Sequence, residues 1–542
     1  MNLTGSQQRT MRRSPAIVFG ITLSAVAVLV FRWVGIKGDR TVFSVRTYGA
    51  KGNGLTKDTL AIQTAIDAAA RVGDGAVLLP PGRYLSGTLH LRSNVTFRLT
   101  SGATLIASRD DADFDPYEHL PAGSFTRALP TWVLASAPRA PLPPRQGSGP
   151  ALTTIDDPAT AYAHYSLIVG DNVNNVRIEG DGVIDGNRTR RGGPKLIALK
   201  NCRHITIRGI TLRNAPNYNI SLIGTEYADL ENLTIVNGYA DGIDPDNSHF
   251  VRIANCYIDS WDDAICAKAS LGLGRRLGTE NLVVKNCVLR TSNNGFKFGT
   301  ESEGNLRNVS FSNSVILRRA RGRAPITGIA IESVDGGTVS GVSVANIVMR
   351  AVRTPIFLRL GNRGRGMTVP RPGRISDVVI SNVTALYAAK PSSIDGLLGS
   401  PICQIKIANV DVQETGGHGF TGLEVPELPE AYPQGEMFGV LPAYSLYARH
   451  VDGLTVSNWR ARWEHLDSRP AAVFDDVRDL RVARFDSRSP NGPQPLILLR
   501  SVERAWFESV YAANPGALLV GTEAVTTGNV GRHGGQPIQA RR

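Results

Sequence analysis

Three aspartates occupy positions from which they could act together. Asp241 and the adjacent pair Asp262 and Asp263 fall on consecutive copies of a sequence repeat. Carboxyl groups can donate and accept protons, and hydrolysis of a glycosidic bond uses at least two of them. The cluster therefore suggests glycosidic-bond chemistry. A polar turn or a calcium site is the alternative interpretation of the same residues.

The repeat consists of an apolar residue, a spacer, a second apolar residue, a spacer and an asparagine. Most copies start roughly 25 to 35 residues apart, a period typical of stacked supersecondary units. The alternation of apolar and polar positions makes each copy a short strand. The copies end at Asn237, Asn255, Asn286, Asn313, Asn346, Asn382, Asn409 and Asn458.

A strand this short cannot bury its apolar face alone, so each copy must stack on the next. Stacking also brings the asparagines into register at a bend, where their side chains can hydrogen-bond along the axis. These features predict an all-β fold, a parallel β-helix. The chain has neither the leucine pattern of leucine-rich repeats nor the Trp-Asp signature of propeller blades.

One end of this solenoid needs a cover, because unpaired strand edges invite aggregation. Residues 58–70 have the spacing of a short amphipathic helix, which we expect to cap the first coil. Its apolar face would comprise Ile62, Ala65, Ile66 and Ala69. The proline-rich segment 120–157 interrupts the repeat, and we expect a loop there.

The N-terminal segment has the features of a targeting or anchoring signal. Arg12 and Arg13 precede an apolar run at 16–31, which fits a signal-peptide core or a membrane anchor. We therefore divide the chain into a signal or anchor at 1–37, a single β-helical catalytic domain at 38–525 and a polar, disordered tail at 526–542. The protein is expected to be exported: periplasmic, secreted or anchored facing outside.

The composition limits the partners. The formal net charge is +13, but no basic stripe with interleaved aromatic residues is present, so we expect no nucleic-acid partner. A positive balance suits an acidic polysaccharide, although a solvated surface gives the same balance. We expect a monomer without a metal or another cofactor. No metal-binding spacing is formed by Cys202, Cys256, Cys266, Cys287 and Cys403.

Four short segments carry a family resemblance. GAKG at 49–52 and LPPGRY at 79–84 look like the N-terminal part of pectate-lyase-superfamily β-helices. DGIDPD at 241–246 and DDAICAK at 262–268 resemble the two aspartate motifs of glycoside hydrolase family 28, the polygalacturonases. The resemblance covers nearly the whole chain after Thr41. It implies a right-handed parallel β-helix and an inverting hydrolase of pectic polysaccharides or oligosaccharides.

The resemblance also implies roles for the three aspartates. Asp262 would be the general acid that protonates the leaving oxygen, and Asp241 and Asp263 would hold and deprotonate the attacking water. Clustered like charges raise at least one carboxyl pKa, which keeps a proton available. Carboxyl separations of roughly 6.5 to 9.5 Å would leave room for that water and predict inversion.

Two coils depart from the family pattern. In NNGFKFG at 293–299, Asn294 takes the place of a histidine between glycines. In GIAIE at 328–332, the Arg-Ile-Lys motif that grips a galacturonate carboxylate is absent, and Glu332 reverses the charge. Tyr239 and Ala240 likewise replace the usual Asn-Thr. The sugar specificity is therefore open.

Coil register indicates which side chains could contact the sugar. Aligned coils stack Ile265, Phe296 and Ile329 inward, and strand alternation turns their neighbours outward. Lys297 could then bind a substrate carboxylate or pair with Glu332 at the surface. If Glu332 faces the sugar, a neutral residue suits it better than a uronate. The candidate substrate-binding residues are Asp244, Lys268, Asn294, Lys297, Glu332 and Arg359.

The segment before Leu454 is a long insertion that could form a cleft wall or a loop packed by its own apolar residues. It contains Tyr432, Met437, Phe438, Tyr444, Tyr447, Arg449 and His450. Two other functions fit the same scaffold. One is a lyase or uronate-modifying enzyme with carboxylate-bound Ca²⁺ and Lys268 or Lys297 as base. The other is a non-catalytic glycan-binding protein.

Overall fold

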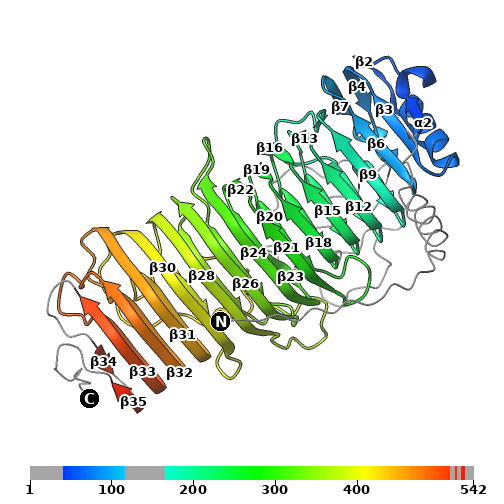
Figure 1. Ribbon diagram of the computed structural model, residues 1–542. Coiled ribbons are helices and arrows are strands. Elements are labelled where there is room, and N and C mark those ends of the chain that lie inside the picture. The colour runs from blue at the N-terminus through cyan, green and yellow to red at the C-terminus, as the bar shows by residue number, and fades with distance from the viewer. Residues whose placement is uncertain (1–40, 116–164, 513–518, 522–525, 531–542) are drawn as a thin grey trace, which may run out of the picture. The chain divides into compact units, whose positions relative to one another are not determined.

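A computed structural model describes residues 41–115, 165–512, 519–521 and 526–530. The strands run parallel, and each pairs with the strand one coil away, so the chain from Val42 onward winds as a right-handed parallel β-helix (Figure 1). The predicted fold is therefore confirmed. The predicted signal or anchor at 1–37 and the proline-rich segment 120–157 lie outside the described residues.

Three ladders of paired strands make up the first coils. The first, called the site ladder, comprises β5 (Leu89–His90), β8 (Ser166–Asp171), β11 (Lys195–Lys200), β14 (Ile220–Ile223), β17 (Ile243–Asp246), β20 (Ile265–Ala269), β23 (Asn294–Ser302), β25 (Thr327–Ser333), β27 (Thr354–Leu360) and β29 (Ser392–Asp395). The second comprises β1 (Val42–Ser44), β3 (Gly75–Leu79), β6 (Val95–Leu99), β9 (Asn174–Gly180), β12 (Arg203–Arg208), β15 (Glu226–Glu231), β18 (His249–Ala254) and β21 (Gly278–Lys285). The third comprises β2 (Asn53–Lys57), β4 (Gly82–Ser86), β7 (Ala103–Ala107), β10 (Val183–Asp185), β13 (Thr211–Arg213), β16 (Thr234–Gly238), β19 (Tyr257–Ser260) and β22 (Val288–Thr291).

The second and third ladders merge from β24 onward, because β21 and β22 both pair with that one long strand. The long strands are β24 (Asn305–Arg318), β26 (Thr338–Arg350), β28 (Arg374–Ala388), β30 (Ile402–Gly416), β31 (Leu446–His465), β32 (Ala472–Ser487) and β33 (Ile497–Ala512). β34 (Leu519–Gly521) and β35 (Thr526–Val530) pair with β33. β35 lies inside the segment that the sequence assigns to a tail from residue 526, so strand pairing continues past the predicted boundary.

The cap is helical as predicted. The helix α2 (Thr59–Arg71) buries Ile62, Ala65, Ile66 and Ala69 and packs against β1 and β3 (Figure 1). Asp58 precedes it and accepts hydrogen bonds from the backbone N–H groups of Lys51 (2.6 Å) and Gly52 (2.9 Å), which fixes the glycine turn. Short 3₁₀ turns form at η1 (Val45–Tyr48) and η2 (Asp111–Asp113). Among the described residues, no helix is both long and apolar enough to cross a bilayer.

The asparagines form the predicted ladder at the bends. The side-chain amides of Asn346, Asn382, Asn409 and Asn458 each donate to the asparagine one coil earlier, at 2.8–2.9 Å. Each has a φ between 52° and 58°, a left-handed conformation that asparagine tolerates better than most residues. Long strands can therefore turn a corner without losing a hydrogen-bond partner.

Replacing one asparagine of this ladder should destabilise the fold. Asn382→Ala removes an amide that donates to Asn346 and accepts from Asn409, and it places alanine, which tolerates positive φ less well than asparagine, in a left-handed conformation. We expect a loss of about 2 kcal/mol in the free energy of unfolding, measured by denaturant melts. Asn382→Gly tolerates the backbone conformation, so it should lose only about 1 kcal/mol. Equal losses in the two variants would show that the backbone conformation contributes nothing to the cost of Asn382→Ala.

The interior stacks follow the predicted register. Ile265 pairs with Phe296, and Phe296 pairs with Ile329, and all three are fully buried. The alternate residues point to the outer face of the site ladder. This register fixes which side chains of neighbouring coils lie next to one another outside the coil.

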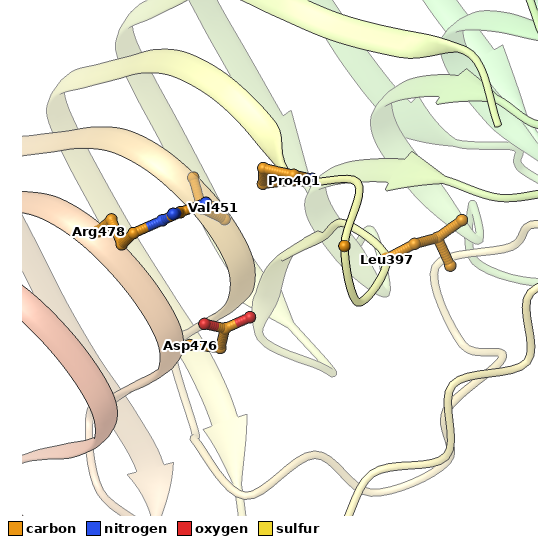
Figure 2. A pocket seen from close by; sticks show the side chains of 6 residues that line it. Leu397, Pro401, Val451, Asp476 and Arg478 are labelled. Carbon is orange, nitrogen blue, oxygen red and sulfur yellow. The ribbon is translucent and has the colours of Figure 1, made fainter. Parts of the chain in front are cut away.

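A small pocket opens where the turn between β29 and β30 meets β31 and β32 (Figure 2). It offers one carboxylate and one guanidinium, not the two carboxyl groups that glycoside hydrolysis needs. It is lined by Leu397, Gly399, Pro401, Val451, Asp476 and Arg478.

Candidate active site

The three aspartates lie where two neighbouring strands of the site ladder begin. Asp241 precedes β17, and Asp262 and Asp263 precede β20. Because Ile243 is in register with Ile265, the two turns lie side by side, and one carboxylate oxygen of each aspartate comes within 4.8 Å of the others. The nearest oxygens are thus closer than the roughly 6.5 to 9.5 Å separation of carboxyl groups that would predict inversion, so spacing alone does not indicate inversion.

Asp241 is buried beside a lysine. Its Oδ2 lies 3.0 Å from Lys268 Nζ, and its Oδ1 accepts the backbone N–H of Asp263 at 3.2 Å. Burial raises the pKa of Asp241 well above its usual value, and the Asp244 carboxylate raises it further, while Lys268 opposes the shift. The carboxyl group therefore holds a proton more readily than an exposed aspartate does.

Asp263 has a different set of partners. Its Oδ1 accepts from the backbone N–H of Asn294 (3.1 Å) and from Asn294 Nδ2 (2.6 Å), and its Oδ2 lies 3.2 Å from Lys297 Nζ. Burial raises the pKa of Asp263; Lys297 lowers it and the neighbouring Asp262 raises it, leaving a net increase. Asn294, which takes the place of the family histidine, thus orients a carboxylate.

Asp262 is the most open of the three. Its side chain is 21% exposed, against 6% for Asp241 and 5% for Asp263. One oxygen accepts from Arg191 Nη1 at 2.6 Å and the other from Asn293 Nδ2 at 2.5 Å. Burial would raise the pKa of Asp262, but the Arg191 guanidinium and the Asn293 amide lower it to about 2. Asp262 is therefore ionised at neutral pH while this ion pair holds.

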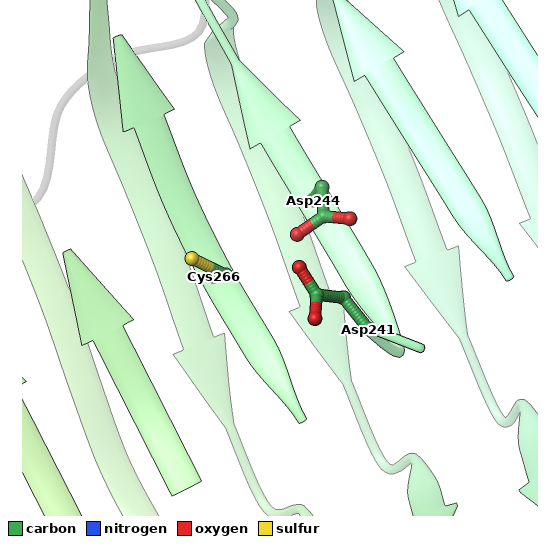
Figure 3. Close-up of side chains that lie close together, drawn as sticks. All are labelled: Asp241, Asp244 and Cys266. Atoms are coloured by element: carbon green, nitrogen blue, oxygen red, sulfur yellow. The ribbon is translucent and has the colours of Figure 1, made fainter. Parts of the chain in front are cut away.

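Asp244 extends the cluster behind Asp241. The two carboxyl groups face each other from the β17 segment, and Cys266 lies on the neighbouring β20 (Figure 3). Lys268 Nζ lies 3.3 Å from Asp244 Oδ1 and 3.1 Å from the Tyr218 hydroxyl, and it sits over the Tyr218 ring. Burial raises the pKa of Asp244 to about 6, with Lys268 opposing the shift.

Lys297 and Glu332 are both buried, unlike the surface pair that one reading of the sequence offered. Lys297 contacts Asp263, and its Nζ donates to the Tyr432 hydroxyl at 3.2 Å. Glu332 is 1% exposed, and burial raises its pKa to about 8 although Lys297 lies nearby. At neutral pH Glu332 is therefore largely protonated and can donate a hydrogen bond.

The connection 417–445 between β30 and β31 explains this burial. Its apolar side chains pack on the outer face of β25, β27 and later coils, while Tyr432 reaches Lys297. The structure confirms that apolar residues pack the insertion, and the cleft wall stays a prediction. Phe438, Leu441 and Ala443 form a second apolar cluster with Ala330, Phe357, Tyr447, Val473 and Leu498.

Arg359 anchors that connection. It is 1% exposed, and its guanidinium donates to the carbonyls of Glu427 (2.6 Å), Leu428 (3.0 Å) and Gly396 (3.3 Å). The sequence predicts a substrate ligand at this position. In the structure the side chain holds a loop instead, because the insertion covers the face of β27 that the prediction left open.

Two groupings could offer ligands to a cation: Asp241 with Asp262 and Asp263, and Asp241 with Asp244 and Cys266. However, Lys268, Lys297 and Arg191 already contact these carboxylates. Protein cations therefore supply the charge that a metal would supply. The burial of Cys266, which raises the pKa of its thiol well above the usual value, also disfavours a thiolate ligand.

Several residues that contact the cluster were missed from the sequence. Arg191 belongs to the β10–β11 connection, where Arg188, Arg190 and Arg191 precede a Gly-Gly-Pro turn; that run of arginines was the available signal. Asn293 is adjacent to Asn294. Tyr218 belongs to no sequence motif, so nothing in the sequence distinguished it from the other tyrosines.

A right-handed parallel β-helix with clustered aspartates on its outer face is the architecture of a carbohydrate-cleaving solenoid enzyme. The glycosyl hydrolases family 28 matches residues 151–427, and the rhamnogalacturonase A/epimerase, pectate lyase-like family matches residues 42–100. The chain belongs to glycoside hydrolase family 28 and is a glycoside hydrolase.

Individual relatives are consistent with this family membership. A probable polygalacturonase of Vitis vinifera is 27% identical over 401 residues, covering 68% of this chain and 74% of the relative. An exo-poly-alpha-D-galacturonosidase of Dickeya chrysanthemi is 24% identical over 406 residues, covering 63% and 62%. The hyperthermoactive exopolygalacturonase from Thermotoga maritima superposes with a TM-score of 0.56 at 18% identity, covering 77% of this chain and 92% of the other, which supports the fold.

Proposed function

We propose that this chain hydrolyses glycosidic bonds in a pectic, uronate-containing polysaccharide outside the cell, with inversion at the anomeric carbon. The observation that carries the proposal is that carboxylate oxygens of Asp241, Asp262 and Asp263 lie within 4.8 Å of one another at the start of neighbouring strands. Polygalacturonase relatives support the substrate class. The basic N-terminus and its apolar run support export, which cell fractionation would test.

We assign the roles of the three aspartates from the exposure of their side chains. Asp262, whose side chain is the most exposed of the three, donates a proton to the leaving oxygen as the bond from that oxygen to the anomeric carbon breaks. Asp241 and Asp263 hold a water and accept its proton as it attacks the opposite face of the sugar. Lys268 and Lys297 favour the ionised forms of these two aspartates, which a base requires.

The free site distributes protons in the reverse sense, with Asp262 ionised and the pKa values of Asp241 and Asp263 raised. A substrate with a good leaving group distinguishes the roles, because such a group departs without a proton. Asp262→Asn should therefore retain most of its activity on an aryl galacturonide, whereas Asp241→Asn should not. The opposite result would assign the acid role to Asp241.

The lyase alternative needs a neutral lysine to remove a proton from the sugar. Burial lowers the pKa of Lys268 and Lys297, but contacts with Asp244 and Asp263 respectively outweigh it, so both pKa values lie well above the usual value. Both lysines remain protonated and are poor bases. This observation favours hydrolysis.

The pH profile provides a further prediction. Asp241 must be ionised to act as a base, so kcat/KM should rise with pH through its raised pKa, giving an acid limb above the usual aspartate range. Asp244→Asn removes a negative charge that raises the pKa of Asp241, so the limb should move to lower pH. The measurement is kcat/KM against pH for both proteins. An unmoved limb, or one moved to higher pH, would contradict the assignment of Asp241 as a base.

A further inference from the structure

Arg191 reaches the acid from a separate part of the chain. It lies in the connection between β10 and β11, three coils before the turn that holds Asp262, and its Nη1 is 2.6 Å from Asp262 Oδ2. Its side chain is 26% exposed. Because Arg191 and Asp262 are in contact and both side chains are partly exposed, a sugar that reaches the Asp262 carboxylate also comes close to this guanidinium.

The other cations at the cluster are less available. The side chains of Lys268 and Lys297 are 5% and 2% exposed, and they are engaged with Asp241, Asp244 and Asp263. The coil at 328–332 contains no cation. Of the three cations in the described part of the chain that contact the aspartates, Arg191 is the one with the most exposed side chain, so an anionic sugar can reach it without displacing a buried lysine.

We propose that Arg191 recognises the carboxylate of a uronate bound at the cleavage site, and that its transfer from Asp262 to that carboxylate lets Asp262 take up the proton it later donates. The inference rests on the proposed hydrolase function and names its specificity determinant. Guanidinium groups bind carboxylates in a fork geometry, so the exchange replaces one ion pair by another of the same kind.

The exchange balances in charge and atoms. Before binding, Arg191 is paired with the Asp262 carboxylate and the substrate carboxylate is solvated. After binding, Arg191 is paired with the substrate, and Asp262 has gained one proton from solvent. During cleavage this proton moves to the leaving oxygen, which also receives the electron pair of the broken bond.

The remaining charged groups around Asp262 act on this proton uptake in both directions. Lys297 on β23 opposes it, while Asp241 from the β17 turn and Asp263 from its own turn favour it. Burial of Asp262 under a sugar would favour it further. The exchange therefore makes protonation of the acid conditional on an anionic substrate, which a neutral sugar does not provide.

Binding of galacturonate to the full-length protein tests the proposal without requiring turnover. Its uncharged methyl ester is the comparison ligand, and a pH indicator at pH about 5 follows proton uptake, since Asp262 is ionised there in the free site. Wild-type protein should take up a proton with galacturonate but not with the ester. Arg191→Gln should weaken galacturonate binding about tenfold or more and abolish the uptake, with less than about a twofold effect on the ester.

Arg190→Gln is the matched control, because Arg190 is an exposed arginine of the same connection. It should behave as wild type, and Arg191→Lys should fall between wild type and Arg191→Gln. Equal weakening of both ligands by Arg191→Gln, or unchanged galacturonate binding and proton uptake, would overturn the proposal. Absence of hydrolysis by wild-type protein would refute the function instead, since the binding result stands separately.

Discussion

Replacing Asp262 with asparagine is expected to lower kcat on a polysaccharide by about 10²- to 10⁴-fold, the contribution of a general acid. The amide has the same shape and still presents an oxygen to Arg191 or Asn293, but it cannot donate a proton of sufficient acidity to a leaving alcohol. The coil should be unaffected, because the side chain lies in a turn at the open side of the site. Release of reducing ends measures the loss, and thermal melting measures the fold.

Asp229→Asn is the control for this variant. Asp229 pairs with Arg252 on the outside of the second ladder, so the change also removes a carboxylate from an aspartate–arginine pair, but away from the cluster. It should leave kcat unchanged. Near wild-type turnover of a polysaccharide by Asp262→Asn would show that Asp262 is not the general acid.

The second large effect concerns stability. Lys268→Met removes an ammonium group that contacts Asp241 (3.0 Å) and Asp244 (3.3 Å) inside the protein. Breaking a buried ion pair from one side typically costs about 3–5 kcal/mol, because the remaining charge is uncompensated. We expect a destabilisation of that order at neutral pH, together with a large loss of activity. Lys285→Met, at an exposed position on β21, should change stability by less than about 0.5 kcal/mol.

The destabilisation caused by Lys268→Met should depend on pH, and it should be larger at neutral pH than at acidic pH. Without Lys268 the pKa values of Asp241 and Asp244, already raised by burial, rise further. Groups whose folded-state pKa is raised bind more protons in the folded state, so their contribution to stability is lost as pH rises. The difference between Lys268→Met and wild type should therefore shrink toward acidic pH and grow toward neutral pH. A deficit that grows on acidification would contradict the charge assignment.

The repeat made much of the fold predictable. Stacked coils share one period, so a motif such as the asparagine at the end of each copy specifies both the local bend and its neighbour one coil away. The same period gave the inward stack of Ile265, Phe296 and Ile329 and brought Asp241 beside Asp262. The cap helix was predictable because its apolar spacing is local.

Contacts from the connections were not predictable in this way. The connections have no period, so nothing in the sequence placed Arg191 beside Asp262 or Tyr432 beside Lys297. For the same reason the burial of Arg359 was missed, since it depends on how the connection 417–445 folds back. These contacts modify the specificity and the proton affinities of a site whose position the repeat defines.

The most direct test of the hydrolase assignment is product analysis. Full-length protein and Asp262→Asn would be incubated with polygalacturonate, rhamnogalacturonan, arabinan and galactan, and the products followed by reducing ends, ultraviolet absorbance and the anomeric configuration first formed. We predict saturated, inverted products from a uronate-containing substrate, and their loss in the variant. Ultraviolet-absorbing unsaturated products, or no product from any of the four polysaccharides, would contradict this prediction.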